Sequence, residues 1–230
     1  VYVVDWVGEL RWPSLANVTV MFCRMGNRVA KQADSSSDLS RVLPQRVAPG
    51  FVLPYGDSPV DDERVAETVY RDILARARRS VRIMTPYLIL DSTLRCALTS
   101  AAKRGVEVSL ILPHIPDKPY AFALAKAHYP ELVAAGVKIY EYTPGFVHAK
   151  VLIADGREAV VGTVNFDYRS LYLHFECAAY LFGCEAIRDM EQDFADTLAK
   201  SQQITLAQAR HPSPAMFLMG HLLKLFAPLM

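Results

Sequence analysis

The sequence predicts an α/β fold, in which a mixed β-sheet is flanked by helices. Short apolar segments alternate with segments of helical period, which is typical of strands and helices packed in layers. An Asp-Gly pair separates two further apolar segments and indicates a hairpin, so antiparallel strands extend the sheet. Of the 230 residues, 52% are hydrophobic and 21% are charged, which is the composition of a folded globular protein.

The elements can be placed in chain order from their periodicity. A helix is expected from Asp61, because Val65, Val69 and Ile73 share one stripe, and Asp61 and Asp62 are expected to stabilise its N-terminus. Strands are expected at Val81–Met84, Val106–Leu112, Val137–Tyr142, Val147–Ala154, Glu158–Thr163 and Phe175–Phe182. Helices are expected at Ser92–Lys103, Tyr120–Ala135 and Glu185–Lys200, and an apolar stretch covers Met216–Met230.

The first fifth of the chain gives a weaker signal. Val1–Val4 and Val18–Phe22 are candidate strands, and Lys31–Arg41 is a polar loop. Prolines and glycines then cluster between residues 44 and 59. We therefore divide the chain into residues 1–50, a poorly defined segment that is the end of a preceding half or a linker, and a domain of residues 51–230.

Composition argues against several classes of protein. The 25 Lys and Arg residues balance 24 Asp and Glu residues, and a net charge of +1 argues against nucleic acid as a partner. The four cysteines show neither a CxxC pair nor metal-ligand spacing, so we expect reduced thiols, no metal and no cofactor. No apolar run reaches the roughly 18 residues of a membrane span. The chain also lacks an initiator Met and a secretory signal, and it is expected to begin within a longer protein.

One group of polar residues suggests chemistry. His148 and Lys150 are two residues apart on an expected strand, so their side chains share a face. If the loop at Asp155-Gly156 has an even number of residues, Thr163 and Asn165 fall on the same face of the neighbouring strand. An odd-numbered loop would break this argument.

The expected cluster suits a phosphodiester and requires no metal. Lys150, Asn165 and Thr163 supply a cation, an amide donor and a hydroxyl for charge on phosphoryl oxygens. The imidazole of His148 can attack phosphorus or protonate a leaving oxygen, and Glu176 is a candidate carboxylate to orient that imidazole. Each residue also has a plainer interpretation: a His-x-Lys pair is usually a solvated face, Asn165 and Asp167 can be turn formers, and His174 can be a surface residue.

Taken together, these residues resemble a known motif. The pattern His148-x-Lys150-x4-Asp155-x6-Gly162-Thr163-x-Asn165 resembles the HKD motif of the phospholipase D superfamily. The flanking segments TPY at 85–87, RGVEV at 104–108, AGVKIYEY at 135–142 and NFDYRS at 165–170 are similar to the C-terminal half of bacterial cardiolipin synthases. The resemblance covers about residues 51–230 and implies a phospholipase D-like mixed sheet with helices on both faces.

The resemblance implies roles for single residues. His148, Lys150 and Asn165 would line a phosphate site, Thr163 would assist, and Glu176 would orient His148. Asp155 is the acidic member of the motif, although its place in a turn suggests a structural role. The family carries two such motifs, each forming half of one active site, and the 230 residues contain one. The other is expected in upstream sequence or in a second subunit.

The function implied is a phosphatidyltransferase that makes cardiolipin from two phosphatidylglycerol molecules through a phosphohistidine. Its partners would be anionic phospholipid, a membrane surface and the missing half, at the bacterial cell membrane with the catalytic domain on the cytoplasmic side. Two alternatives remain open: a phosphodiesterase or nuclease formed by two copies of the chain, and a non-catalytic lipid-binding half. The apolar end, Met216–Met230, can pack on its own domain or lie at a lipid interface.

Overall fold

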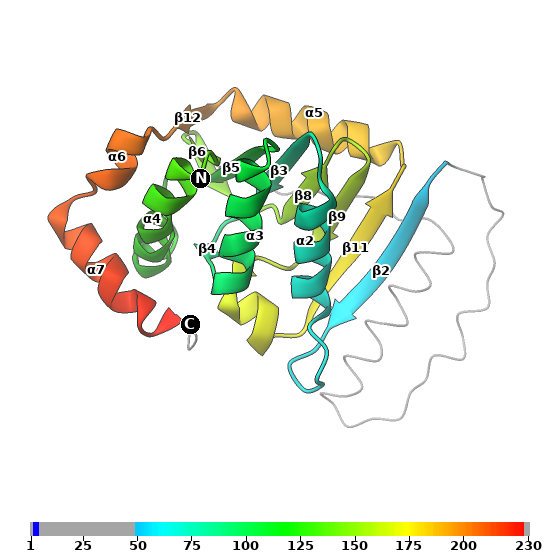
Figure 1. The fold of residues 1–230 in the computed structure, drawn as a ribbon, viewed down its shortest axis with the longest axis horizontal. Coiled ribbons are helices and arrows are strands. Elements are labelled where there is room, and N and C mark those ends of the chain that lie inside the picture. The colour runs from blue at the N-terminus through cyan, green and yellow to red at the C-terminus, as the bar shows by residue number, and fades with distance from the viewer. Residues whose placement is uncertain (1, 5–48, 228–230) are drawn as a thin grey trace.

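An eight-stranded mixed sheet forms the centre of the protein (Figure 1). The structure is a computed structural model that describes residues 2–4 and 49–227. The strands follow the order β12-β6-β5-β3-β8-β9-β11-β2. Their bounds are β2 (Phe51–Asp57), β3 (Ser80–Met84), β5 (Glu107–Pro113), β6 (Lys138–Tyr142), β8 (Val151–Ala154), β9 (Glu158–Gly162), β11 (Glu176–Phe182) and β12 (Ser201–Gln203).

The sheet combines a parallel half with an antiparallel half. Strands β3, β5 and β6 are parallel, as the strand–helix alternation predicts. Strands β8, β9, β11 and β2 run antiparallel to their neighbours, and so does β12. Two short parallel pairs lie outside this sheet: β1 (Tyr2–Val4) with β7 (Gly145–Val147), and β4 (Leu88–Ile89) with β10 (Phe166–Asp167).

Helices cover both faces of the sheet (Figure 1). The helices are α2 (Val65–Arg76), α3 (Ser92–Lys103), α4 (Pro119–Ala134), α5 (Ala186–Leu198), α6 (Leu206–Arg210) and α7 (Pro214–Lys224), with a π-helical turn, η2 (Arg169–Leu173). Side chains of α2, α3 and α4 form one core with Leu152 of β8, and those of α5 form another with Val151 and Ile153. This alternation along β8 confirms a strand buried on both faces.

The helix expected from Asp61 begins four residues later, at Val65. Asp61 and Asp62 do not cap it, and the preceding residue, Arg64, gives no side-chain cap. Instead Asp57, the last residue of β2, accepts a hydrogen bond from the Ala66 N–H at 2.9 Å. The carboxylate that accepts a hydrogen bond from the first turn of α2 therefore belongs to the preceding strand. The spacing of residues next to the helix could not predict this contact.

The expected strand Val147–Ala154 is interrupted. Residues 148–150 lie between β7 and β8 and belong to neither strand. Of the N-terminal expectations, Tyr2–Val4 is a strand, whereas Val18–Phe22 and Lys31–Arg41 lie outside the described residues. Within residues 49–227, none of the helices has the length and apolar character needed to cross a bilayer.

Candidate active site

Strand direction gathers polar residues at one edge of the sheet. The carboxyl end of β3 meets the amino end of β8, because the two strands are antiparallel. By the same rule the carboxyl end of β9 and the amino end of β11 lie at this edge. Lys150, Thr163 and Glu176 therefore come to one edge, beside Thr85 at the end of β3. In open α/β sheets, this is the edge where ligands bind.

The segment 148–150 presents its two polar side chains on one side. Val147, Ala149 and Val151 are buried and pack in the core under α5, so the alternating residues His148 and Lys150 face the other way. The Lys150 ammonium donates a hydrogen bond to the carbonyl of His148. The His148 ring lies 5.9 Å from the ring of Phe146, measured between centroids. The ammonium and the imidazole are thus carried by one short, tethered segment.

The even loop expected at Asp155-Gly156 is wrong. Arg157 N–H donates to the Ala154 carbonyl at 3.0 Å, and Asp155 and Gly156 have φ of 56° and 65°. The ladder nevertheless pairs Ala154 with Glu158, so three residues separate the strands. The extra residue shifts the phase, and Gly162, not Thr163, stands beside Lys150, with its N–H 3.3 Å from the Lys150 carbonyl.

The two motif segments come together because β8 and β9 are neighbouring strands. The pairing register does not place Thr163 on the same face as Lys150. The chain leaves β9 at a bend on Thr163, directly after the Gly162 N–H that bonds to the Lys150 carbonyl, and Thr163–Asn165 continues past the end of the strand. Buried Tyr70 holds this continuation by donating its hydroxyl to the Val164 carbonyl at 2.8 Å. That the imidazole, ammonium and amide meet on one phosphate stays a prediction.

Thr163 is bound to the strand beside it. Its N–H donates to the Cys177 carbonyl at 2.9 Å, and its hydroxyl accepts from the Cys177 N–H at 3.0 Å and donates to the Glu176 carboxylate. Burial raises the pKa of Glu176, which is 7% exposed, while hydrogen bonds from Thr163 and Ser170 act to lower it. His174 Nδ1 lies 4.0 Å from Oε1 of this carboxylate. An orienting contact from Glu176 to His148 remains a prediction.

Asn165 carries a buried polar atom that has no partner among the described residues. Its Nδ2 donates to the Ser170 hydroxyl at 2.9 Å, and its Oδ1 is buried without a hydrogen bond. The Ser170 hydroxyl has a single hydrogen, which is directed to the Glu176 or Asp167 carboxylate, so toward Asn165 it acts as the acceptor. The unmatched Oδ1 would be satisfied by a hydrogen-bond donor such as a hydroxyl of a bound substrate.

A pocket of about 340 Å³ opens beside Asn165 and Glu176. Its lining includes three basic residues, Lys118, Arg169 and His174, and the acidic residue Asp167. Asp167 is buried, which raises its pKa, and it accepts the Ser170 N–H at 2.7 Å. His148 and Lys150 are not among the lining residues of this pocket.

Sequence reasoning missed most of these pocket residues. Asp167 and Ser170 belong to the NFDYRS segment, but the sequence pattern assigned Asp167 only a turn role and assigned Ser170 no role of its own. Tyr87, from the TPY segment, also lines the pocket and donates its hydroxyl to Asp117 at 2.5 Å. The available signal was the group of polar residues, Asp167, Arg169 and Ser170, that follows shortly after Asn165.

Asp155 lies at the other end of β8 and β9, away from the site edge. Its carboxylate accepts hydrogen bonds from the N–H groups of Arg78, Arg79 and Ser80 at 3.0, 2.7 and 3.0 Å. Burial acts to raise the pKa of Asp155, but these donors outweigh it and the pKa is lowered. Asp155 therefore joins the β8–β9 hairpin to the start of β3.

Metal ligands are not grouped in the part of the chain that the structure describes. Within residues 2–4 and 49–227, no three His, Cys, Asp or Glu side chains come together in a way that could hold a metal ion. The polar groups at the site edge are an imidazole, an ammonium, an amide, a hydroxyl and carboxylates. Of these, the ammonium and the amide donors can neutralise an anion.

Comparison with known proteins places this chain in a family. Residues 70–198 match the family described as cardiolipin synthase, PLD-like domain. An uncharacterized protein of Streptococcus mutans is 49% identical over 229 residues, which is 100% of this chain and 50% of that protein. Cardiolipin synthase 2 of Bacillus anthracis is 42% identical over 155 residues, 67% of this chain and 30% of that protein. The chain thus spans at most about half the length of these relatives.

A solved structure supports the fold. The phospholipase D family member Nuc from Salmonella typhimurium aligns with a TM-score of 0.58 at 19% identity, covering 68% of this chain and 99% of that one. The chain belongs to the phospholipase D superfamily, within its cardiolipin synthase family of PLD-like domains.

Proposed function

We propose that this chain supplies one half-site of a phosphatidyltransferase that joins two phosphatidylglycerol molecules into cardiolipin and releases glycerol. The observation that carries the proposal is the backbone contact between Gly162 and Lys150, which brings both motif segments to one sheet edge, where Asn165 lines a pocket with basic side chains. Membership of the cardiolipin synthase family supports it. We place the protein at the bacterial cell membrane, with this domain on the cytoplasmic side.

The chemistry proceeds in two displacements at phosphorus. In the first, an imidazole nitrogen bonds to phosphorus, the bond from phosphorus to the glycerol oxygen breaks, and that oxygen takes a proton from a general acid. In the second, the headgroup hydroxyl of another phosphatidylglycerol gives up its proton and attacks, and the phosphorus–nitrogen bond breaks. His148 serves as the nucleophile or the acid, and a histidine of the other half-site takes the other role.

Lys150 and Asn165 act on charge and do not exchange protons with substrate. The phosphoryl oxygens gain negative charge in each displacement, and an ammonium and an amide fixed in advance stabilise that charge. The carboxylate of Glu176 is held by Thr163, on the strand beside the motif. We assign it to orienting an imidazole, either His148 or the nearby His174.

Conversion of phosphatidylglycerol vesicles tests the proposal. The protein, with both half-sites present, is incubated with phosphatidylglycerol that carries one label in the headgroup glycerol and another in the phosphate. Cardiolipin and free glycerol are measured, together with the phosphate label retained on denatured protein. We expect equal amounts of the two products, loss of both by at least about 10³-fold in His148→Ala, and no loss in His211→Ala, which changes an exposed histidine elsewhere. A chelator should leave the rate unchanged.

Other results would overturn the proposal in distinct ways. Full cardiolipin formation by His148→Ala would remove His148 from the mechanism. Phosphatidic acid as the sole product would identify a hydrolase, and a mass in solution of twice the chain weight with that activity would identify paired copies. Lipid binding without release of glycerol would identify a non-catalytic half.

A further inference from the structure

Helix α7 contacts the rest of the protein along a narrow line. Gly220 faces α4 so closely that an added Cβ would lie 2.5 Å from the Ala123 carbonyl oxygen. Leu223 and Ala227 pack beside it, and the Lys224 ammonium donates to the Ala127 carbonyl at 2.8 Å. Because the helix rests on its glycine side, its larger apolar residues are left on the outside.

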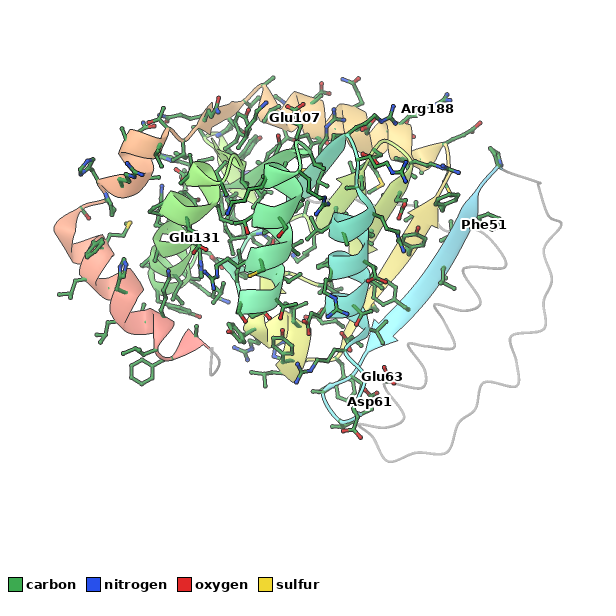
Figure 2. The ribbon with its side chains drawn as sticks, in the orientation of Figure 1. Phe51, Asp61, Glu63, Glu107, Glu131 and Arg188 are labelled. Atoms are coloured by element: carbon green, nitrogen blue, oxygen red, sulfur yellow. The ribbon has the colours of Figure 1, made fainter. Side chains whose placement is uncertain are left out.

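The outer side of α7 is apolar and exposed. Leu218, Leu222 and Leu225 are spaced by four and three residues, so they form one stripe, and they are 69%, 56% and 76% exposed. Phe217, Met219 and Phe226 flank the stripe and are also exposed. Figure 2 shows side chains projecting from α7 away from the sheet. We call these six residues the α7 apolar face; a contiguous apolar surface of this kind usually marks a binding site.

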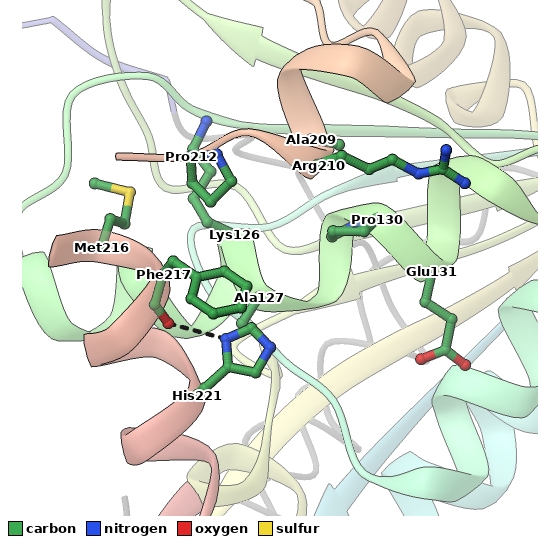
Figure 3. A pocket seen from close by; sticks show the side chains of 10 residues that line it. All are labelled: Lys126, Ala127, Pro130, Glu131, Ala209, Arg210, Pro212, Met216, Phe217 and His221. Carbon is green, nitrogen blue, oxygen red and sulfur yellow. Dashed lines mark hydrogen bonds between the residues drawn. The ribbon is translucent and has the colours of Figure 1, made fainter. Parts of the chain in front are cut away.

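Basic residues outnumber acidic ones around this face, where Lys126, Arg210 and one carboxylate, Glu131, line the neighbouring cavity. Asp196 is the last acidic residue of the chain, and Lys200, Arg210 and Lys224 follow it. A cavity of about 310 Å³ lies beside the face; Phe217 and His221 of α7 line one side, and Arg210 and Glu131 lie across from them (Figure 3). Glu131 is already bound to Arg95 at 2.6 Å. The surroundings of the α7 apolar face therefore favour an anionic partner.

The α7 apolar face adjoins the candidate active site. Leu223 and Ala227, at the end of α7, belong to a cluster with Tyr87, Ile89 and Ala121. Those three residues also line the pocket beside Asn165 and Glu176. A surface that covers α7 would thus meet the mouth of the pocket through this shared cluster.

We propose that the α7 apolar face is a membrane-binding surface that inserts into the interface of an anionic phospholipid bilayer and brings the neighbouring pocket to the lipid headgroups. An interfacial helix needs an apolar stripe together with cationic flanks, and α7 offers both. The proposal deepens the proposed function by naming how the domain meets its substrate, and it rests on that function for the substrate alone. Binding to lipid can be measured without turnover.

Vesicle flotation tests the surface directly. The chain is mixed with vesicles of phosphatidylcholine containing one third phosphatidylglycerol, or with phosphatidylcholine alone, and the bound fraction is measured at low and high salt. We expect strong binding only with phosphatidylglycerol and weaker binding as salt rises. Leu218→Gln with Leu222→Gln should lower the partition coefficient by a factor of about ten or more, and Arg210→Gln by about five.

A matched control separates this face from apolar exposure in general. Leu53 and Val60, 62% and 69% exposed, lie at the opposite side of the fold, in and after β2. Leu53→Gln with Val60→Gln should leave vesicle binding unchanged. Equal binding by both double variants would overturn the proposal. So would a Leu218/Leu222 variant that keeps its vesicle binding but changes from dimer to monomer, because that result would assign the face to a second copy.

A soluble substrate separates this proposal from the proposed function. Short-chain phosphatidylglycerol, presented as monomers, does not require an interface. We expect the Leu218/Leu222 variant to keep its turnover of this substrate while losing most of its turnover on vesicles. Absence of turnover on both substrates in the unmodified protein with both half-sites present, with vesicle binding intact, would refute the proposed function and leave the membrane surface standing.

Discussion

Replacement of Gly162 by alanine should destabilise the fold strongly, although alanine is the better strand residue. Gly162 is the glycine of the motif and lies in β9 directly opposite Ala178 of β11. An added Cβ would lie 2.4 Å from the Cys177 carbonyl oxygen and 2.5 Å from the Ala178 Cα. Both contacts are with backbone, so a side chain cannot rotate to relieve them.

The expected cost follows from these contacts. Propensity alone would favour alanine over glycine by about 0.5–1 kcal/mol. Overpacking against two backbone atoms costs roughly 1–3 kcal/mol, and separating the strands also weakens the bond from Thr163 N–H to the Cys177 carbonyl by about 1 kcal/mol. Repulsion outweighs propensity, and we expect a net loss of about 1–3.5 kcal/mol in the free energy of unfolding.

Urea unfolding measures this loss, with a second glycine as the control. A Cβ on Gly105 would meet no atom within 4 Å, and Gly105 has φ of +90°. Gly105→Ala should therefore cost only the backbone strain of about 1–2 kcal/mol. Gly162→Ala should in addition release Thr163 from Glu176, and it should reduce activity per folded molecule. An unfolding free energy of Gly162→Ala within about 0.5 kcal/mol of the unmodified protein would refute the reasoning.

Two further predictions concern charge and pH. Asp155→Asn should lower the free energy of unfolding at pH 7 by about 2 kcal/mol, because the carboxylate accepts three backbone N–H groups. The pKa of Asp155 is lowered in the fold, so this contribution is present above the ordinary pKa and is lost as pH falls through the folded pKa. Urea titrations at pH 7 and pH 2 check it, and an undiminished difference at pH 2 would contradict it. For His128, burial lowers the pKa to about 3, with Lys224 and Arg95 assisting, so stability should fall by roughly 4 kcal/mol as pH drops from 6.5 to 3. His128→Leu should flatten that slope, and an unchanged slope in thermal scans would count against the assignment.

Much of the layered fold follows from local pattern. Ser92–Lys103 is a helix with the bounds that its periodicity predicts, and β5 is displaced by one residue from its expected range. Strand β2 was not predicted, because Pro54 and Gly56 lie inside it and signal a loop. Both are accommodated in a strand that is paired only with β11 in the described sheet.

The candidate site could be predicted only in part for a related reason. Residue spacing located His148, Lys150 and Asn165, since a motif is a local pattern. The register of the hairpin depends on a single extra loop residue, Arg157, and the Asp155-Gly156 turn signal does not indicate that residue. The pocket residues depend on which segments meet at the edge, which is a property of strand order and not of spacing.

The pairing of β2 with β11 also sets when this protein can complete its fold during synthesis. Asp57 stands opposite Glu176, about 120 residues later in the chain. At ribosomal rates of about 5–20 residues per second, the first of these strands waits roughly 6–24 seconds for its partner. Phe51 and Leu53 are exposed even in the finished strand, so the nascent chain carries an uncovered apolar segment throughout that interval. A chaperone acting on this protein should engage it there, and release should follow translation of β11.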